Sequence, residues 1–582
     1  MSRFLKKGKR KQERGITLIA LITTIIVLLI LAGISIGAIT GSNGIIGQAQ
    51  SAKEETEIAQ EKEIIDISTV EAMGKNNRGN LEEEEFQNAI SNHTNGNVTV
   101  SDIGEEFEVF FEESNRYYSV DKDGNILDYV IGATDQYPGD ITRKEDGTVL
   151  NGSIDKPYEI NCIEDLVTLQ NMARGEGIKL ENGKVVEIKN ADNFSGKYVS
   201  LKRTLDFNSS ASYNDCNRTE YGDLNQDGKV EGLREELTKK DTGCVGFKPI
   251  GTSRLAVTFD GEENEIRNIY QHITTSESVA GLFTGIDVKV KNLTLTGEII
   301  NDNWHAGGIL SNVSNLTNNA AIENCINYAN VTGKNMVGGI ANCVSSSNES
   351  NIINCKNYGN ITMTGSSWGY AGVGGIVGYV SGNRKIENCQ NYGEIKGSSV
   401  GGIVGTIIGS IINNCTNYAN INNGILGRTY NGTVTIMNCC NLGECTNGIV
   451  GNFSGNDWNF ELVLNIQNSY NLGNVSGAGI IGAQGTYCKK TTLNIENCYN
   501  AGQSKNAILG SRTTSSRTET ITNIKNTYYE KEKSESVGAI EDGITAIDIE
   551  NNNSFVEILN SNIGDNTNWK KWTLGENGYP TL

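Results

Sequence analysis

Proline and histidine are scarce in this chain of 582 residues, which has 4 prolines and 3 histidines. With so little proline and abundant Ile and Val beside 68 glycines, the chain differs from a disordered linker and can bury a core. His93, His272 and His305 leave few bases for a Ser-His-Asp arrangement, and we expect each to be a solvent-exposed bystander. The sequence also lacks H-E-x-x-H and C-x-x-C segments. We therefore predict no catalytic residues.

Charged side chains are absent from residues 15–52, and residues 16–39 are almost continuously apolar. A run of about 20 apolar residues crosses the hydrocarbon layer as a helix, so we predict a transmembrane helix over residues 16–40. Residues 1–15 form a basic leader with seven Lys and Arg against one Glu, which places them in the cytoplasm and the rest outside. A cleaved signal peptide is the alternative, but its apolar region is usually shorter.

The junction between the leader and the apolar run reads G-I-T-L-I-A from Gly15 to Ala20. It resembles the start of type IV prepilins and pseudopilins, where a glycine precedes F-T-L-I-E. The resemblance implies that a prepilin peptidase cuts between Gly15 and Ile16. It also implies a glutamate at the fifth mature position, where this chain has Ala20. Because that carboxylate would pair with a neighbouring subunit inside the filament core, we expect an anchor rather than a polymerising pilin spine.

The exported part of the chain is acidic. The leader carries a net charge of +6, which leaves −26 for the remainder of a chain whose formal net charge is −20. Phosphate binding requires clustered Lys and Arg, so nucleic acid is excluded as the expected partner.

Residues 41–132 predict a helix extension followed by a small pilin-like α+β domain. Apolar residues recur at helical spacing over residues 49–73, and a shorter helix is predicted over residues 81–90. Alternating segments that predict antiparallel strands follow at residues 98–100, 107–111 and 117–120. Residues 133–152 are polar and contain Pro138, and we predict a linker there.

We predict that residues 153–300 form the entry region of a repeat array, with a helix over residues 163–174 and a strand over residues 198–207. Its phrases F-K-P-I-G-T, from Phe247, and G-L-F, from Gly281, resemble the region before GLUG-type repeats in bacterial surface proteins.

A candidate calcium loop lies within this region. It reads D-x-N-x-D-G-K-V and resembles the loops of EF-hands and dockerins, whose oxygens converge on Ca²⁺. Position twelve, normally the bidentate acid, is Arg234, so the segment predicts either a calcium loop or an Asx-rich turn. The candidate ligating positions are Asp223, Asn225, Asp227, Lys229 and Glu231.

Eight repeats dominate residues 301–536. An Asn-Cys pair followed by Asn-Tyr, as in Asn324-Cys325 and Asn327-Tyr328, recurs every 24 to 34 residues and weakens toward the C-terminus. Each copy is preceded by an apolar phrase that begins as Gly-Gly-Ile. A unit of this size cannot bury its apolar face alone and must stack on its neighbours. We therefore predict a mainly β protein with a parallel β-solenoid of about eight or more coils, closed by a C-terminal cap over residues 537–582.

Stacking predicts rows of identical residues along the axis, with asparagine amides hydrogen-bonded to one another and glycines at corners with positive φ. Loops are expected where coil length varies, at residues 345–350 and 455–461, and would carry a binding surface. Six of the thirteen cysteines share one register, which predicts a reduced buried row, with disulfides or a metal as alternatives. They are Cys325, Cys355, Cys389, Cys415, Cys439 and Cys498.

Three functions are consistent with these features. The first is a single-pass, membrane-anchored bacterial surface protein without catalytic activity, which binds a glycan or protein ligand in adhesion or cell-surface interaction. The second is a minor pilin-like component of a type IV pilus or type II secretion-like filament. The third is a polysaccharide-acting β-helix enzyme, for which we find no cluster of carboxylates with Lys or Arg at a fixed register.

Overall fold

The computed structural model describes residues 45–582 apart from several internal segments, and the chain divides into two compact units, Met1–Thr134 and Asp135–Leu582. The predicted leader and transmembrane helix lie outside the described residues. Among the helices that are described, none is long and apolar enough to cross a membrane. The internal segments left out are 76–80, 95–97, 103–105, 112–115, 132–140, 143–148, 176–177, 180–184, 187–190, 208–243, 275–278, 313–320, 346–350, 367–368 and 456.

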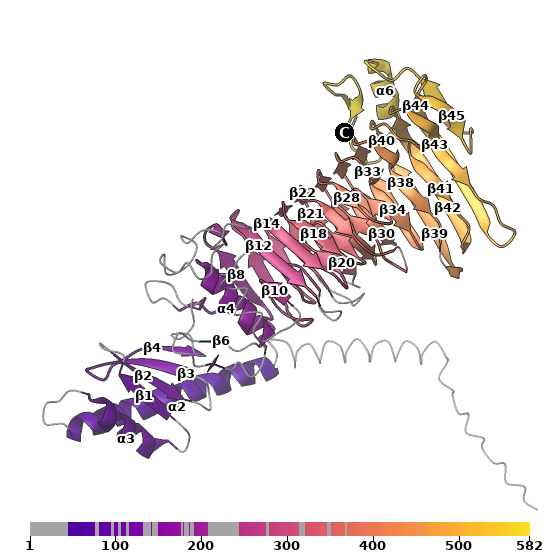
Figure 1. The fold of residues 1–582 in the computed structure, drawn as a ribbon. Coiled ribbons are helices and arrows are strands. Elements are labelled where there is room, and N and C mark those ends of the chain that lie inside the picture. The colour runs from indigo at the N-terminus through magenta and orange to yellow at the C-terminus, as the bar shows by residue number, and fades with distance from the viewer. Residues whose placement is uncertain are drawn as a thin grey trace, which may run out of the picture. The chain divides into compact units, whose positions relative to one another are not determined.

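The first unit packs two helices against a four-stranded antiparallel sheet of order β1-β2-β3-β4 (Figure 1). Both predicted helices and the three predicted strands are present, and β4 is an additional strand. A single core joins them, in which Phe86 packs edge-on against Phe107 at 5.8 Å between ring centroids. The elements are α2 Ile45–Lys75, α3 Glu83–His93, β1 Val98–Asp102, β2 Glu106–Phe111, β3 Arg116–Asp121 and β4 Ile126–Ile131.

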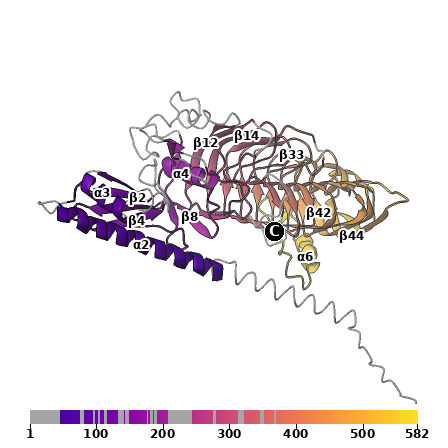
Figure 2. The same ribbon diagram turned by 90° about the horizontal axis from the view of Figure 1, so that it is seen from below.

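The second unit is mainly β, and its coils stack as parallel strands from β8 to β44 (Figure 2). Equivalent residues of successive coils pair directly, for example Ile322 with Ile352 and Val331 with Ile361. One continuous apolar core runs through the coils. This arrangement confirms the predicted stack of parallel strands.

The strands of the second unit fall into several sheets, and their bounds are as follows. The largest sheet contains β5 Tyr158–Ile160, β8 Lys197–Leu201, β9 Leu205–Asp206, β10 Cys244–Gly246, β11 Val257–Asp260, β12 Glu265–Ile273, β13 Lys289–Lys291, β14 Thr294–Asn301, β16 Ala321–Glu323, β17 Ile326–Asn327, β18 Asn330–Gly333, β21 Asn351–Ile353, β22 Lys356–Asn357, β23 Ile361–Met363, β26 Lys385–Glu387, β27 Gln390–Asn391, β28 Ile395–Lys396, β31 Ile411–Asn413, β32 Thr416–Asn417, β35 Gly432–Met437, β36 Cys440–Asn441, β39 Asp457–Gln467, β40 Tyr470–Asn471, β42 Cys488–Asn500, β44 Glu519–Glu530 and β46 Ile544–Ile547. The second sheet contains β20 Ala341–Ser345, β25 Val377–Ser381, β30 Val404–Ile408, β34 Leu426–Thr429, β38 Val450–Phe453, β41 Ile481–Gln484, β43 Ser504–Arg512 and β45 Ser534–Gly538. The smaller sheets contain β15 Ala306–Gly307, β19 Val337–Gly338, β24 Val373–Gly374 and β29 Val400–Gly401, then β33 Ile421–Asn423 with β37 Cys445–Asn447, β6 Ile178–Lys179 with β7 Val185–Val186, and β47 Thr573–Leu574 with β48 Pro580–Thr581.

The solenoid begins earlier than the repeats. Strand β5 pairs in parallel with β8, and β8 pairs with β11, so the predicted entry region of the solenoid contains coils. The predicted helix is α4 Ile163–Arg174, which packs Ile163, Leu166 and Leu169 into the core at the N-terminal end of the solenoid (Figure 1). The repeats therefore continue a stack that less regular sequence has started.

The segment predicted as a linker is partly ordered against the second unit. Ile141 is fully buried in the solenoid core, and its carbonyl accepts a hydrogen bond from the Glu159 backbone N–H at 3.1 Å. Leu150 is also buried. Isolated apolar residues in a polar stretch gave no periodic signal, which is why the composition indicated a linker.

Asparagine, not glycine, provides the repeated backbone turn with positive φ. Asn324, Asn354 and Asn388 have φ of 54° to 56°, in the left-handed region that asparagine tolerates better than most residues. The Gly-Gly-Ile glycines have a different role, because a Cβ on Gly339 would collide with the Gly375 carbonyl of the next coil. The glycines of this phrase therefore do not form the predicted corners with positive φ, although other glycines of the solenoid, such as Gly297 and Gly432, do have positive φ.

The C-terminal region lies along the side of the last coils. Strands β45 and β46 still pair with the preceding coil, and helix α6 Asn553–Ser561 follows. Both views place α6 beside the last coils (Figures 1 and 2). Residues 559–572 then hydrogen-bond to asparagines of several different coils. The predicted cap thus covers a lateral face, whereas the prediction concerned the end of the stack.

Candidate functional site

Seven buried asparagines, one in each coil, form a hydrogen-bonded row inside the solenoid. Each of the first six donates Nδ2 to the Oδ1 atom of the next, for example from Asn327 to Asn357 at 2.9 Å and from Asn471 to Asn500 at 2.7 Å. Each also donates to a carbonyl two residues ahead in its own coil, as Asn327 does to Ala329. Because buried amides without partners are costly, the row fixes the register of the coils. Its members are Asn327, Asn357, Asn391, Asn417, Asn441, Asn471 and Asn500.

The cysteine row is structural. Its six members are buried free thiols, and Cys389 Sγ lies 3.2 Å from the Glu387 carbonyl and 3.6 Å from the Ile352 carbonyl of the preceding coil. Ser469 and Thr527 take the same position in two other coils and donate to the same kind of carbonyl. The position therefore selects a small hydrogen-bond donor.

A second asparagine row lies on the outside and consists of the residues with positive φ. Asn354 Nδ2 donates to Asn324 Oδ1 at 2.9 Å, and Asn388 Nδ2 donates to Asn354 Oδ1 at 2.9 Å. Exposure falls along this outer asparagine row: Asn324, Asn354 and Asn388 are exposed, whereas Asn438 and later members are buried. The buried part is covered by the C-terminal segment. The row consists of Asn324, Asn354, Asn388 and Asn414, followed by Asn438, Asn468 and Asn497, and the two parts meet where Asn438 donates to Asn413 beside Asn414.

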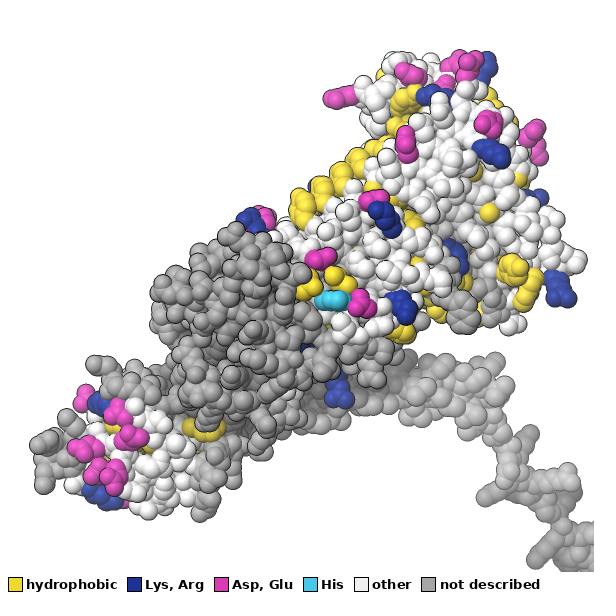
Figure 3. Space-filling model, in the orientation of Figure 1, with side chains coloured by type: hydrophobic (Ala, Val, Ile, Leu, Met, Phe, Trp, Pro, Cys, Tyr) yellow, Lys and Arg dark blue, Asp and Glu magenta, His cyan; other side chains and the backbone are white. Residues whose placement is uncertain are grey.

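Four tyrosines stack beside the exposed part of this row. Tyr328, Tyr358, Tyr392 and Tyr418 have successive ring centroids 4.7, 4.5 and 4.4 Å apart, with rings nearly parallel. Figure 3 shows a row of hydrophobic side chains along this edge of the second unit. Desolvation within the stack, reinforced by the neighbouring Tyr418, raises the pKa of Tyr392 to about 12. Because the ring faces cover one another, this tyrosine ladder offers mainly ring edges and hydroxyls to a partner.

Three exposed aromatic side chains form a separate aromatic patch, defined as Trp458, Phe460 and Tyr487. They are 42%, 49% and 65% exposed, and the rings of Trp458 and Tyr487 lie 6.0 Å apart. The patch lies where β39 and β42 extend, with Asp457 paired to Cys488 before a bulge (Figures 1 and 3). Residues 457–461 of the predicted loop belong to strand β39, while residues 346–350 of the other predicted loop are outside the described part.

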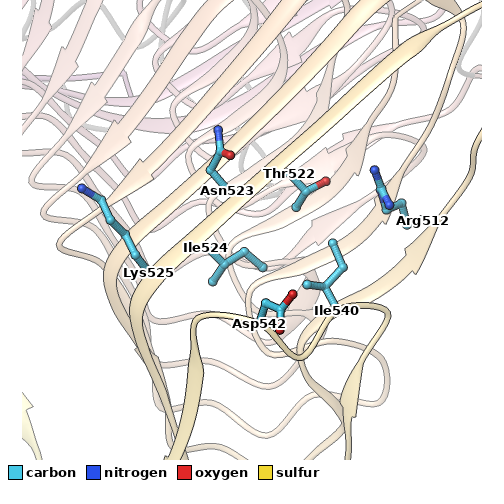
Figure 4. Close-up of a pocket in the computed structure, with 7 residues that line it drawn as sticks. All are labelled: Arg512, Thr522, Asn523, Ile524, Lys525, Ile540 and Asp542. Atoms are coloured by element: carbon cyan, nitrogen blue, oxygen red, sulfur yellow. The ribbon is translucent and has the colours of Figure 1, made fainter.

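A depression of about 510 Å³ lies at the end of the last coil, where Ile540 and Asp542 face Ile524 (Figure 4). Of the polar side chains that line it, all but Asp542 have a hydrogen-bond or ion-pair partner among the described residues. Lys525 forms an ion pair with Glu496 at 2.5 Å, and Arg512 donates to the Thr520 carbonyl at 3.0 Å. The depression therefore has no converging set of free polar groups for a ligand.

Histidine environments differ from the prediction at one position. The Nε2 atoms of His93 and His272 lie at hydrogen-bond distance, 2.8 Å, from carboxylate oxygens of Glu71 and Asp302 near the surface. His305 is buried, and its Nδ1 atom accepts a hydrogen bond from the Met336 backbone N–H at 3.2 Å. Burial lowers the pKa of His305 to about 4. His305 is thus a neutral core residue rather than an exposed bystander.

The predicted calcium loop and the processing site fall outside the described residues. This applies to Asp223, Asn225, Asp227, Lys229 and Glu231, and to Gly15 and Ile16. Within the part of the chain that is described, no three His, Cys, Asp or Glu side chains come together as metal ligands.

Comparison with known proteins finds structural similarity to one solved structure. No protein-family model and no curated protein matches the chain. A candidate immunoglobulin A1 protease from Bacteroides ovatus is similar in structure, with 17% sequence identity and a TM-score of 0.31. The match covers 75% of this chain and 94% of that chain.

The sequence predicted the stacked rows and a binding surface at residues 455–461, but it did not single out the aromatic side chains of the patch or the contact made by the C-terminal segment. The aromatic patch had a signal, because W-N-F at residues 458–460 interrupts an otherwise polar insertion. The contact between the C-terminal segment and the outer asparagine row had none, since it joins residues more than 100 positions apart.

Proposed function

We propose that the chain is a membrane-anchored, surface-exposed, non-catalytic β-solenoid protein that functions in adhesion or another cell-surface interaction. The observation that carries the proposal is the aromatic patch. The membrane anchor is inferred from residues 16–40 and the cytoplasmic leader from residues 1–15. The non-catalytic assignment is likewise drawn from the sequence, with its few histidines and lack of H-E-x-x-H.

The patch has the chemistry of a binding surface. Exposing Trp458, Phe460 and Tyr487 together forgoes apolar burial, which is worth about 1.5–3 kcal/mol for a large side chain. Such patches with polar surroundings mark interaction sites, and Trp and Tyr dominate the energy of many interfaces. Lys489 and Glu461, 3.8 Å apart at the same extension, provide the polar surroundings. A glycan or a protein surface fits this combination of aromatic and polar groups.

Binding of the full chain in detergent to glycan and matrix-protein arrays tests the proposal. The variant Trp458→Ala/Tyr487→Ala is expected to lose at least about tenfold in affinity for the ligand that the native chain binds. Tyr370→Ala is the matched control, because it removes an exposed aromatic ring that belongs neither to the patch nor to the tyrosine ladder. Absence of any bound ligand, or equal binding by the double variant, would contradict the proposal.

The first unit favours a second candidate, a minor pilin-like component of a filament. A helix of 31 residues beside an antiparallel four-stranded sheet is the arrangement expected of a small pilin-like head. In this case prepilin peptidase would release Ile16 as the new N-terminus, and shearing would remove the protein from cells. Mass spectrometry of the N-terminus and fractionation after shearing distinguish the two candidates, because an anchored protein stays with the membranes.

A further inference from the structure

The covered part of the outer asparagine row uses its full hydrogen-bonding capacity. Asn438 Nδ2 donates to Asn413 Oδ1 at 2.8 Å and to the Asn568 carbonyl at 2.9 Å. Its Oδ1 atom accepts from Asn468 Nδ2 at 2.8 Å and from the Lys570 backbone N–H at 3.0 Å. A primary amide has two donors and two acceptor lone pairs. For Asn438, one acceptor lone pair serves the row and one donor serves Asn413, while the other donor and the other lone pair serve the backbone of the C-terminal segment.

The next rung repeats this pattern. Asn468 Nδ2 donates to Asn438 Oδ1 and to the Lys570 carbonyl at 3.0 Å. Its Oδ1 atom accepts from Asn497 Nδ2 at 2.8 Å and from Trp572 Nε1 at 2.7 Å. The segment therefore advances two residues for each coil, and each asparagine offers it one donor and one acceptor.

The asparagines in the exposed part of the row are hydrogen-bonded to one another in the same way, but half of their hydrogen-bonding capacity is unused. Asn354 donates to Asn324 and accepts from Asn388, both at 2.9 Å. The structure gives Asn354 no other side-chain hydrogen bond among the described residues. One N–H and one lone pair on each of the three exposed rungs thus face solvent at the spacing that binds Asn568 and Lys570 further along.

We infer that Asn324, Asn354 and Asn388, with the tyrosine ladder beside them, form a docking strip for an extended polypeptide segment of a partner protein. These exposed asparagines continue the surface that already binds the C-terminal segment at Asn438 and Asn468. The docking strip is independent of the proposed function, because it shares no residue with the aromatic patch.

The chemistry of the strip specifies the partner. A donor and an acceptor on each rung match a backbone carbonyl and the N–H two residues later, as Asn568 and Lys570 show. Glu323 and Glu387 directly precede two of the asparagines, so a basic side chain is favoured beside the row. Lys570 provides the precedent, since its Nζ atom contacts Asn414 Oδ1 at 2.7 Å.

Photo-cross-linking of the full chain with a synthetic peptide tests the inference. The peptide has the sequence of residues 566–574, N-T-N-W-K-K-W-T-L, with a benzophenone side chain in place of Leu574. The chain's own segment already occupies the covered rungs at high effective concentration. We expect a saturable adduct that maps to residues 354–392, and none with a scrambled peptide.

The variant Asn354→Gly/Asn388→Gly is expected to reduce the adduct at least tenfold. Glycine keeps the positive φ of these positions and removes both amides. Asn388→Asp, which keeps an acceptor and loses the donors, is a second variant with the same expected direction. Asn360→Ala, an exposed asparagine outside the row, is the matched control and should bind normally. Equal labelling of the double variant, labelling confined to residues 438–472, or no saturable adduct would overturn the inference.

Discussion

The indole nitrogen of Trp572 donates a hydrogen bond of 2.7 Å to the side-chain oxygen of Asn468, which lies 104 residues earlier. The Trp572 side chain is almost fully buried, and its ring centroid lies 5.5 Å from that of Tyr470 and 5.6 Å from that of Tyr499. One residue therefore supplies apolar packing on the outside of the coils and also saturates a rung of the outer asparagine row. This double role makes Trp572 the anchor of the C-terminal segment.

Replacement of Trp572 tests this role. Trp572→Ala should destabilise the C-terminal segment by about 3–5 kcal/mol, because it removes a large buried ring. Trp572→Phe keeps most of the packing and removes one of the two donors to Asn468 Oδ1, which costs about 0.5–1.5 kcal/mol. Hydrogen exchange of residues 550–582 measures both effects.

Trp458→Ala is the control for the Trp572 variants, because Trp458 is 42% exposed and its removal should leave exchange in residues 550–582 unchanged. If Trp572→Ala exchanged as slowly as the native chain in this segment, Trp572 would not be the anchor.

For the row of buried asparagines inside the solenoid, we predict that loss of a single amide lowers the free energy of unfolding by a large amount. Asn417→Ala would remove the acceptor of one Asn391 Nδ2 hydrogen and the amide that donates to Asn441 Oδ1, both in the core. With an unpaired buried polar group costing about 1–3 kcal/mol, the expected loss of unfolding free energy is at least about 2 kcal/mol. Urea denaturation measures it. Asn420→Ala, an exposed residue three positions later, should cost less, and equal costs would contradict the assignment.

The periodicity of the sequence was sufficient for much of the fold. The recurrence of Asn324 and Asn327 every 24 to 34 residues predicted stacked parallel coils, and the predicted amide contacts along the axis are confirmed. Helical spacing of apolar residues predicted α4 over the observed range. These features are local or strictly repeated, so a single sequence carries them.

Features that depend on contacts between distant residues could not be predicted. Gly339 and Asn354 are both common turn residues, and only the closeness of the next coil shows which one needs small size and which one needs positive φ. Burial of Ile141 and His305 depends on coils that lie far apart in the sequence. The docking of Trp572 on Asn468 likewise follows from no spacing rule.

The buried thiols are predicted to be unreactive in the folded chain. Burial raises the pKa of Cys343 and of Cys498 to about 12, so thiolate is negligible at pH 8. Iodoacetamide should leave both unlabelled in the native chain and label them in urea, as mass spectrometry would show. Stability should fall as pH rises above 9, because the unfolded thiols then ionise while the folded ones do not. Rapid native labelling of Cys498 would contradict its burial.

We predict that positions of the cysteine row accept serine with little loss of stability. Cys389→Ser should unfold at nearly the native urea concentration, since Ser469 already occupies the equivalent position and donates to a carbonyl at 2.7 Å. Cys389→Leu, which adds volume to a close-packed interior, should cost about 1–3 kcal/mol. A larger loss for serine than for leucine would show that the position does not select for a small donor.

His305 predicts acid sensitivity of the solenoid. Its pKa is about 4 in the folded chain, below the ordinary 6.5, because burial opposes the charged ring. As pH falls below 6.5 the unfolded chain binds a proton that the folded chain does not, so stability falls until pH reaches about 4. The loss attributable to His305 is about 3 kcal/mol.

The difference between the native chain and His305→Gln isolates this contribution. Burial raises the pKa of Asp165 to about 6, so Asp165 increases stability as pH falls from 6 to 4, opposite to His305. Because Asp165 is present in both proteins, its effect cancels in the difference. We expect urea midpoints of the two proteins to converge as pH falls from 7 to 4. Parallel profiles for the native chain and His305→Gln would show that His305 is protonated in the folded state.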